Sequence, residues 1–439
     1  MLRRAYLRLL LAMLAAFSMW FYVQRILIPH ERSEAALHGT PRGNLSDLYP
    51  RWLGARELLL HHRNPYSPEI TREIQTGYYG RPLDPTRSAD PHDEQRFAYP
   101  VYVVFLLAPV IGLPFPVVAI VFRWLLLLLT AGSALLWLHA LRWKVSCTTL
   151  AIVLLLTLGS FPAIQGMKLQ QLSLLVSAMI AAAAALLVAG HLTSAGILLA
   201  LAAIKPQLVF LLVPVLMMWV ISDWSARKRL VWGFAATMLL LLIVAEIILP
   251  GWLGQFRTAM SDYYRYTGGG LSLLDVLAGP LVGKTLAAIL IVILAAIAFR
   301  NRKAPFSSTM FISTFAAILA VTIVVIPTFA PYNQLLLLPA ILIVLRDRQV
   351  FRSSKPALRV MVALLAGVIA WPWMASITLT LAALAIPSTE LQKYWAVPLF
   401  TSLAIPLAVL LLLFLRLRHP DHLTSVAALS FDPKHRNLP

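Results

Sequence analysis

Long uninterrupted stretches of Leu, Ile, Val, Ala and Phe constrain this chain more than any other feature. They are too long for the strands of a membrane barrel and do not alternate with polar residues, so they predict helices. Of the 439 residues, 60% are hydrophobic and only 13% are charged, and the mean hydropathy is +0.79. A soluble protein needs more charge on its surface. The composition excludes soluble, disordered, collagen-like and coiled-coil classes and predicts an all-α polytopic membrane protein.

The lengths of the apolar runs predict about 12 transmembrane helices. The first covers approximately residues 5–28. It is interpreted as a retained span, because its run is too long for a signal peptide and lacks a clear small-residue cleavage site. The other predicted spans lie at about 115–141, 148–164, 171–189, 193–204, 207–221, 230–250, 281–299, 306–327, 332–346, 357–386 and 395–417.

The distribution of Arg and Lys orients these spans and divides the chain. Basic residues before the first span and in alternate loops place both termini in the cytoplasm. The net charge of +19 is attributed to these loops, since no nucleic-acid-binding module is visible. The short, proline-interrupted run 98–112 is interpreted as a helix in the outer interface rather than a crossing. The predicted segments are a first transmembrane helix (1–28), an extracytoplasmic loop with interfacial helices (29–114), a helical bundle (115–417) and a cytoplasmic tail (418–439).

Polar residues that could bind a substrate or take part in catalysis are concentrated on the predicted outer side. The first loop carries more than half of the 18 acidic residues, whereas the spans hold few ionisable groups near their centres. A channel or transporter normally places such groups near the bilayer midplane. Within the loop, an amphipathic helix follows Asp47, a second short helix begins at Ser67-Pro68, and 78–96 is expected to be a loop. This distribution suits an enzyme acting at the outer interface on an amphiphilic substrate.

Two charged residues stand out. Lys205 ends an apolar helix directly before Pro206, where its ammonium is offered at the depth of a lipid phosphate; simple snorkelling to the headgroups is the alternative. Asp47 is either the N-cap of the amphipathic helix or a general base held at the membrane surface.

Weaker candidates for sugar or phosphate binding lie in the turns. Lys168 and Gln171 flank a helix N-terminus. Arg265 belongs to the Tyr-rich segment 262–266 before Gly268-Gly269-Gly270, which is expected to be a mobile outer loop, and Asn333 opens another span. The single cysteine, Cys147, excludes a disulfide framework, and the ten histidines show no metal-ligand spacing, so neither a metal site nor a cofactor is expected.

The order of several short motifs resembles glycosyltransferase family 87. The motifs are Asp47-Leu-Tyr, Asn64-Pro65-Tyr66, Phe97-Ala-Tyr99-Pro100, Gln171-Leu-Ser, Ala195-Gly196 with Lys205-Pro206, and the Pro331-Tyr-Asn333 turn. The resemblance is clear over about 47–221 and rests on hydropathy beyond it. Val101 follows Pro100 where the family often has a second proline, and Gln170-Gln171 stands where it has Gly-Gln.

The resemblance implies a GT-C-like bundle with a large structured first extracytoplasmic loop, and an enzyme that uses polyprenyl-phosphate sugars. Mannose is the family's best-known donor sugar, and metal independence and inversion at the anomeric carbon are also implied. Asp47 would be the catalytic base and Lys205 the phosphate ligand, with Arg265 or Lys168 assisting. Gln171, Tyr99, Tyr66 and Asn333 are the further substrate-binding candidates. The acceptor would be a hydroxyl of a lipid, a glycan or a protein, at the outer face of a bacterial plasma membrane.

Three alternatives remain open from the sequence. A transporter or flippase of lipid-linked sugars predicts polar residues through the midplane and internal pseudo-symmetry, neither of which is evident. Another GT-C enzyme, such as an oligosaccharide ligase or a protein-directed mannosyltransferase, would share the outer-loop aspartate. A noncatalytic assembly subunit would not need Asp47 and Lys205 on one side of the membrane.

Overall fold

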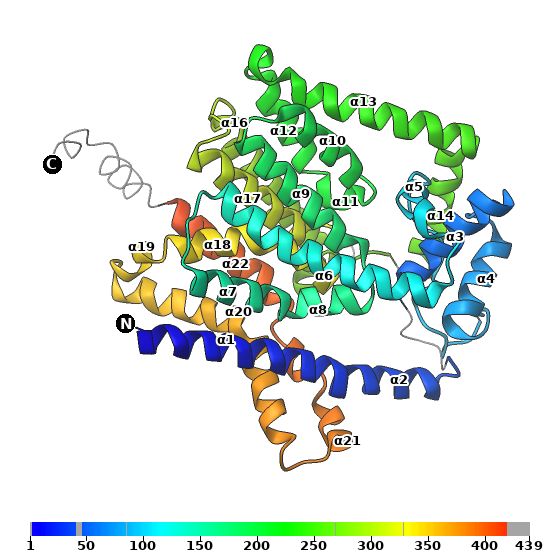
Figure 1. The fold of residues 1–439 in the computed structure, drawn as a ribbon, viewed down its shortest axis with the longest axis horizontal. Helices are drawn as coiled ribbons and strands as arrows, with labels where there is room; N and C mark the ends of the chain where they lie inside the picture. Colours follow the sequence, from blue (N-terminus) through cyan, green and yellow to red (C-terminus); the bar gives the residue numbers. More distant parts are fainter. Residues whose placement is uncertain (1, 41–45, 85, 268, 328, 419–439) are drawn as a thin grey trace.

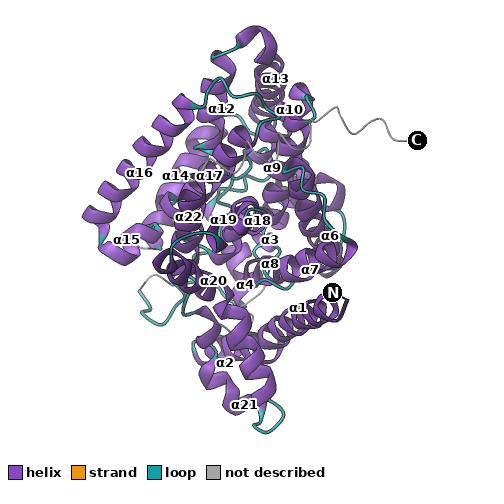
Figure 2. Ribbon diagram, turned by 90° about the vertical axis from the view of Figure 1, so that its left-hand side faces the viewer, coloured by secondary structure: helices purple, strands orange, loops and turns teal. Residues whose placement is uncertain are grey.

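The computed structural model describes residues 2–40, 46–84, 86–267, 269–327 and 329–418. The described residues form helices and loops and include no strand (Figures 1 and 2). This confirms the all-α prediction. The Gly268 part of the predicted glycine loop and the predicted tail from residue 419 onward lie outside the described residues.

Six helical segments among the described residues are long and apolar enough to cross a membrane, or up to seven if a bent pair counts as one. The six are Arg3–Leu37, Phe115–Ala140 (α6), Trp224–Ile248 (α13), Pro280–Arg300 (α16), Pro356–Ala382 (α20) and Ser388–Leu417. The shorter apolar helices are Leu172–Val188 (α9), Leu192–Ala202 (α10), Leu212–Ile221 (α12), Thr309–Val325 (α17) and Pro331–Arg346. Each predicted span coincides with a helical segment, so the chain is a polytopic membrane protein. That all of them cross the bilayer stays a prediction.

The first helix is longer than its apolar run. The α-helix α1 (Leu2–Tyr22) continues through a π-helical stretch, Val23–Leu27, into α2 (Ile28–Leu37). Together they form one long rod along the lower edge of Figure 1. The loop predicted to begin at Pro29 therefore begins only after Leu37, at His38. Proline is tolerated at the start of a helix, and the π-helical stretch lies just before it.

The predicted span 148–164 is a broken helix. Its two parts, α7 (Cys147–Leu158) and α8 (Phe161–Lys168), meet at an angle of 52°. Ser160 caps α8 by accepting a hydrogen bond from the backbone N–H of Ala163, and Pro162 follows in the first turn. A cap and a proline together start a new helix in a new direction. The break allows α8 to end beside the first loop.

The first loop is packed onto the end of the bundle by its own helices. They are α3 (Leu48–His61), α4 (Pro68–Tyr79) and the short α5 (Val103–Leu107). Ser67 caps α4, as predicted, by accepting from the N–H of Ile70 at 3.3 Å. In α5, Val103, Val104 and Leu107 are fully buried. The run 98–112 therefore contains no long interfacial helix: α5 has five residues and packs against α3.

The Tyr-rich segment 262–266, predicted to be part of a loop, is helical. Helix α14 (Trp252–Tyr266) lies beside α3 and α5, at the right of Figure 1. It begins after Gly251, whose φ of +70° favours glycine. The prediction of a loop was wrong, because the tyrosines face other side chains across an amphipathic helix and do not form a turn.

The remaining short elements complete the bundle. They are α11 (Pro206–Val209), α15 (Leu273–Ala278), the 3-10 helix η3 (Pro331–Leu337), α18 (Leu338–Arg346), α19 (Gln349–Arg352), α21 (Ser388–Leu391) and α22 (Ala404–Leu417), with single 3-10 turns at Ala108–Val110, Gln392–Tyr394 and Val397–Leu399. The beginning of α1 and the end of α22 lie on the same side of the molecule, opposite α3, α4 and α14 (Figure 1).

Helices α10 and α13 pack closely against each other through two glycines. A Cβ atom on Gly196 would lie 2.2 Å from the carbonyl oxygen of Leu230, and one on Gly233 would lie 2.2 Å from that of Thr193. The two backbones therefore touch, as small residues permit in membrane helices. This contact fixes α10, which ends three residues before Lys205.

Candidate active site

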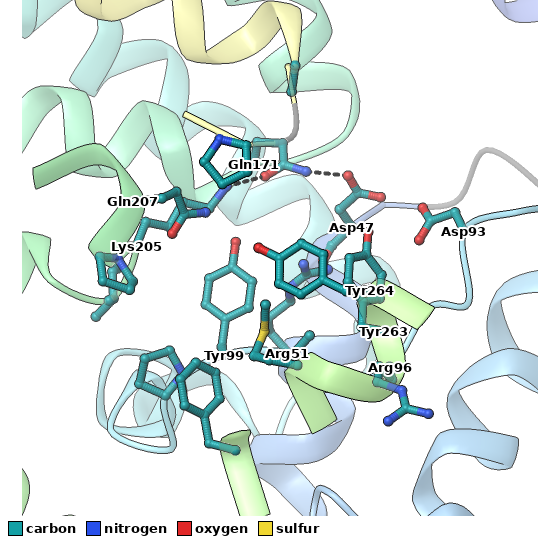
Figure 3. Close-up of a pocket in the computed structure, with 18 of the residues that line it drawn as sticks. Asp47, Arg51, Asp93, Arg96, Tyr99, Gln171, Lys205, Gln207, Tyr263 and Tyr264 are labelled. Atoms are coloured by element: carbon teal, nitrogen blue, oxygen red, sulfur yellow. Dashed lines mark hydrogen bonds between the residues drawn. The ribbon is translucent and has the colours of Figure 1, made fainter. Parts of the chain in front are cut away.

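A cavity of about 270 Å³ opens where the first loop meets the ends of the bundle helices. Its walls come from segments far apart in the chain: the start of α3, the strand-like segment 93–100, the starts of α9 and α11, helix α14 and the start of η3. Polar and aromatic groups line it (Figure 3). Both Asp47 and Lys205 belong to this lining.

Asp47 stands directly before α3, but its carboxylate does not cap that helix. The hydroxyl of Ser46 performs that task by accepting from the N–H of Leu48 at 3.0 Å. The backbone is docked on the turn after α8, because the N–H of Asp47 donates to the carbonyl of Leu169 at 2.9 Å. The half-buried carboxylate is thus left to face the cavity, where the hydroxyl of Tyr78 donates to it at 3.3 Å. The side-chain cap proposed for Asp47 is therefore supplied by Ser46 instead.

Gln171 joins the carboxylate to the lysine. Its side-chain N–H₂ group donates to Asp47, and its amide oxygen accepts from the Lys205 ammonium at 2.7 Å (Figure 3). An amide oriented from both ends in this way cannot flip without losing two hydrogen bonds. The preceding residue, Gln170, has a φ of +51°, which is uncommon for a residue with a side chain. This sharp turn ends the α8 segment and directs Gln171 into the cavity.

Lys205 is buried, with 5% of its surface exposed. Besides Gln171, its ammonium donates to the hydroxyl of Ser173 at 2.7 Å and lies 5.3 Å from the ring centroid of Tyr332 and 5.7 Å from that of Tyr99. All of these partners are neutral. No carboxylate among the described residues lies within ion-pairing distance of this ammonium. A buried, uncompensated cation is costly, so the site favours an incoming anion.

A second cation lies on the same wall. The Arg51 guanidinium, one turn into α3, donates to the backbone carbonyl of Asp47 and stacks over the ring of Tyr99, 4.5 Å from its centroid. Tyr99 in turn is held from behind, because the hydroxyl of Tyr66 donates to its carbonyl at 2.6 Å. The ring of Tyr99 therefore stands between the two cations, a favourable position for an aromatic face.

Asp93 lies on the far side of Asp47 from Lys205 (Figure 3). Its carboxylate accepts from the side-chain amide of Gln95 at 2.5 Å, and its carbonyl accepts from the hydroxyl of Tyr79 at 2.6 Å. The surrounding protein and, next, the charge of Asp47 raise the pKa of Asp93 to about 6. The side chain of Asp93 is exposed and lines the cavity, so it is open to a ligand. With a pKa of about 6, its carboxylate is mostly ionised at neutral pH.

The other candidates divide into two groups. Asn333 lines the cavity, and its side-chain oxygen accepts from Ser173 at 2.7 Å. Three lie outside the cavity lining: Tyr66 supports Tyr99, Lys168 is paired with Glu31 of α2, and the largely exposed Arg265 lies 3.7 Å from Asp262. No cluster of three or more His, Cys, Asp or Glu residues suited to a metal ion occurs in the described part of the chain.

Residues that the sequence did not single out complete the site. They are Arg51, Asp93, Gln95, Arg96, Gln207, Phe256 and Met260. Tyr263 and Tyr264, from the Tyr-rich segment 262–266, and Tyr332, from the Pro331-Tyr-Asn333 turn, also line the cavity. Arg51 carried a signal, since it lies one helical turn after Asp47 and so on the same face. Nothing in the sequence distinguished Asp93, because it is one of several acidic residues in a polar segment.

The family model of "Glycosyltransferase family 87" matches residues 97–327, more than half of the chain. The chain belongs to glycosyltransferase family 87. It is therefore a membrane glycosyltransferase, which confirms the resemblance seen in the motifs. The matched region contains Tyr99, Gln171 and Lys205, whereas Asp47 and Asp93 precede it. Comparisons with curated proteins and with solved structures gave no match.

Proposed function

We propose that the protein transfers a sugar, a hexose such as mannose, from a polyprenyl-phosphate carrier to an acceptor hydroxyl at the extracytoplasmic face of the membrane. Family membership supports glycosyl transfer in a membrane. The carrier, the sugar and the direction of the site are the parts that are proposed.

One observation carries the proposal. A single cavity holds a buried ammonium, Lys205, and a carboxylate, Asp47, joined through one amide, and neither has an oppositely charged partner within ion-pairing distance among the described residues. The ammonium suits a phosphate, and the carboxylate suits a hydroxyl that must lose a proton. A flippase needs the anion site but not the base beside it.

The mechanism follows from this layout. The donor phosphate lies against Lys205, next to the rings of Tyr99 and Tyr332. The acceptor oxygen attacks the anomeric carbon as the bond between that carbon and the phosphate oxygen breaks. The phosphate leaves as the polyprenyl phosphate anion, and its charge is stabilised by Lys205. Asp47 takes the proton of the acceptor hydroxyl. A single displacement of this kind inverts the anomeric carbon.

The assay incubates the purified protein in nanodiscs with a panel of polyprenyl-phosphate hexoses and a membrane lipid extract. Release of polyprenyl phosphate and formation of a glycosylated product are followed together. We expect both with at least one donor. Release from none of them, at a level equal to that of heat-inactivated protein, would overturn the proposed carrier.

The base is tested by Asp47→Asn, which keeps the shape of the side chain and removes its basicity. We expect kcat to fall by about 10²–10⁴-fold, the usual contribution of a general base. The donor KM should change little. The matched control is Glu69→Gln, an exposed acid of the same loop in α4. Near-normal turnover by Asp47→Asn would contradict the assignment.

A further inference from the structure

The cavity has two chemically different ends. Lys205 makes one end cationic, whereas the other end, beyond Asp47, carries Asp93 and the tyrosines of α14, and Arg51 lies between the two ends (Figure 3). The proposed function uses the cationic end and the base. Nothing in it uses the end at Asp93.

We propose that Asp93 binds the acceptor by accepting hydrogen bonds from two adjacent hydroxyls, so that the acceptor presents an uncharged saccharide. This inference rests on the proposed function and adds the class of acceptor to it. Asp93 is thereby a specificity-determining residue of the reaction.

The first argument is the charge balance around Asp93. Arg96, three residues along the chain, is already occupied: its guanidinium donates to Glu94 at 2.6 Å and lies 3.3 Å from the carboxylate of Asp262, while Arg51 acts on Asp93 only through its charge. No basic side chain of the described residues is within ion-pairing distance of Asp93 itself. An ionised carboxylate only accepts, and beside the hydrogen bonds from Gln95 its two oxygens have capacity for further donors. Hydroxyl groups supply them in charge-assisted hydrogen bonds.

The second argument concerns what Asp93 and Asp47 exclude. Both carboxylates face one cavity, and the charge of Asp47 contributes to the raised pKa of Asp93. A phosphate or carboxylate on the acceptor would meet two like charges here, which costs free energy. The anion of the donor avoids this end because its counter-charge, Lys205, lies at the other.

The third argument concerns the aromatic wall of the cavity at this end. Tyr263 and Tyr264 of α14 line this end of the cavity. Their helix is fastened to the Asp93 segment, because Arg96 contacts Asp262 and the hydroxyl of Tyr266 donates to the carbonyl of Pro91 at 3.1 Å. Aromatic rings combine apolar area with a polar hydroxyl, which fits a sugar that has both apolar C–H faces and hydroxyl edges.

The geometry also places the reaction. Figure 3 shows Asp47 between Asp93 and Lys205. In the proposed scheme, a saccharide whose two hydroxyls bind Asp93 presents a neighbouring hydroxyl to Asp47, on the side of the proposed donor site. Asp93 does not take a proton in this scheme; it holds the acceptor while Asp47 does.

The experiment compares wild type with Asp93→Asn and Asp93→Glu, and with Glu69→Gln as control. The donor is the one that gives most release in the panel. The acceptor probes are hexyl α-mannopyranoside, hexyl glucopyranoside and hexyl galactopyranoside, with 1-hexanol as an alcohol that lacks adjacent hydroxyls. Thermal unfolding in detergent checks that each variant is folded.

For the best hexyl hexoside, we expect Asp93→Asn to raise the acceptor KM by about tenfold or more while kcat stays within about threefold and the donor KM is unchanged. Asp93→Glu should recover part of the loss, and Glu69→Gln should behave as wild type. An unchanged acceptor KM, a parallel rise of the donor KM, or 1-hexanol accepted as well as any hexoside would overturn the inference.

A second measurement separates the two proposals. Saturation-transfer NMR of the same hexosides, without donor, reports binding in the absence of turnover. Suppose that the protein releases no polyprenyl phosphate, but that wild type gives hexoside signals which Asp93→Asn lacks. This result would overturn the proposed reaction and support the saccharide site. Absence of binding and of transfer for all three hexosides would overturn the saccharide site.

Discussion

At the scale of single residues, Asp93 gives the reaction a pH dependence. Its pKa is raised to about 6, so its carboxylate is protonated as the pH falls through that value. The titratable groups around it are Asp47, Arg51, Tyr79, Tyr263 and Tyr266. The acceptor KM of wild type should therefore rise as the pH is lowered from about 7.5 to 5. Asp93→Asn should give a flat acceptor KM over the same range.

The same shift has a definite sign for stability. The pKa of Asp93 in the folded protein lies above the ordinary value of 3.8, so between these values the folded state holds a proton that the unfolded chain has released. The contribution of Asp93 to the free energy of unfolding consequently falls as the pH rises through this window. Thermal unfolding of wild type and Asp93→Asn at pH 4 and pH 7 measures it. A difference between the two proteins that grows in favour of wild type with rising pH would contradict the raised pKa.

Gln171 is expected to act as a positioning residue. Gln171→Met keeps the length of the side chain but removes both hydrogen bonds that orient Asp47 and Lys205. We expect kcat to fall by about 10–100-fold, less than for Asp47→Asn, because the base and the cation remain but are held less firmly. Gln349→Met, on an exposed residue of α19, is the control. A loss as large as that of Asp47→Asn would indicate that Gln171 acts on substrate directly.

These residues also show what the sequence could supply. Asp47, Gln171 and Lys205 were found because each lies in a motif, next to a helix end. Lys168 and Arg265 look equally suitable in the sequence, yet each has an acidic neighbour, and the one beside Lys168, Glu31, lies 137 residues away. A contact of that range leaves no trace in a single sequence.

At the scale of elements, the contact between α10 and α13 holds the lysine in place. Gly196→Ala would bring a methyl group to 2.2 Å from a backbone carbonyl of α13, so the helices must separate. Overpacking of this kind costs about 1–3 kcal/mol. We expect a fall in the thermal unfolding midpoint and in the affinity for donor, since α10 leads directly to Lys205.

Gly132→Ala is the matched control, because Gly132 lies within α6 and a Cβ there meets nothing within 4 Å. Its midpoint should stay the same or rise slightly, as alanine favours helix. Equal losses in both variants would show that the close approach of α10 and α13 does not matter.

The apolar runs of the sequence predicted where the helices lie, but not where they break. The length of a run indicates how much apolar chain must be buried or placed in lipid, so the twelve predicted runs match helical segments. Ser160 and Pro162 divide one such run. Both residues are visible in the sequence, but they lie inside an apolar stretch that was interpreted as one helix. Helix α14 was missed because its tyrosines and the glycines after it resemble a loop, and only packing against the first loop makes it a wall of the cavity.

At the scale of the whole molecule, the proposal requires the cavity and the basic loops to lie on opposite sides of the membrane. The single cysteine makes this testable. Cys147 is exposed and follows Arg142 and Lys144 at the start of α7, on the side predicted to be cytoplasmic. Ser88 is exposed in the first loop, five residues before Asp93 in the sequence.

A membrane-impermeant maleimide applied to intact cells should therefore leave wild type unlabelled until the membrane is opened. In the Cys147→Ser background, Ser88→Cys should be labelled in intact cells to the same extent as in opened ones. A cysteine-free Cys147→Ser protein gives the background. The reverse labelling pattern would place the cavity on the cytoplasmic side. The Lys and Arg of the loops would then lie outside, against the positive-inside rule. A donor carried on the outer leaflet could not then reach Lys205, and the acceptor at Asp93 would have to be a cytoplasmic saccharide.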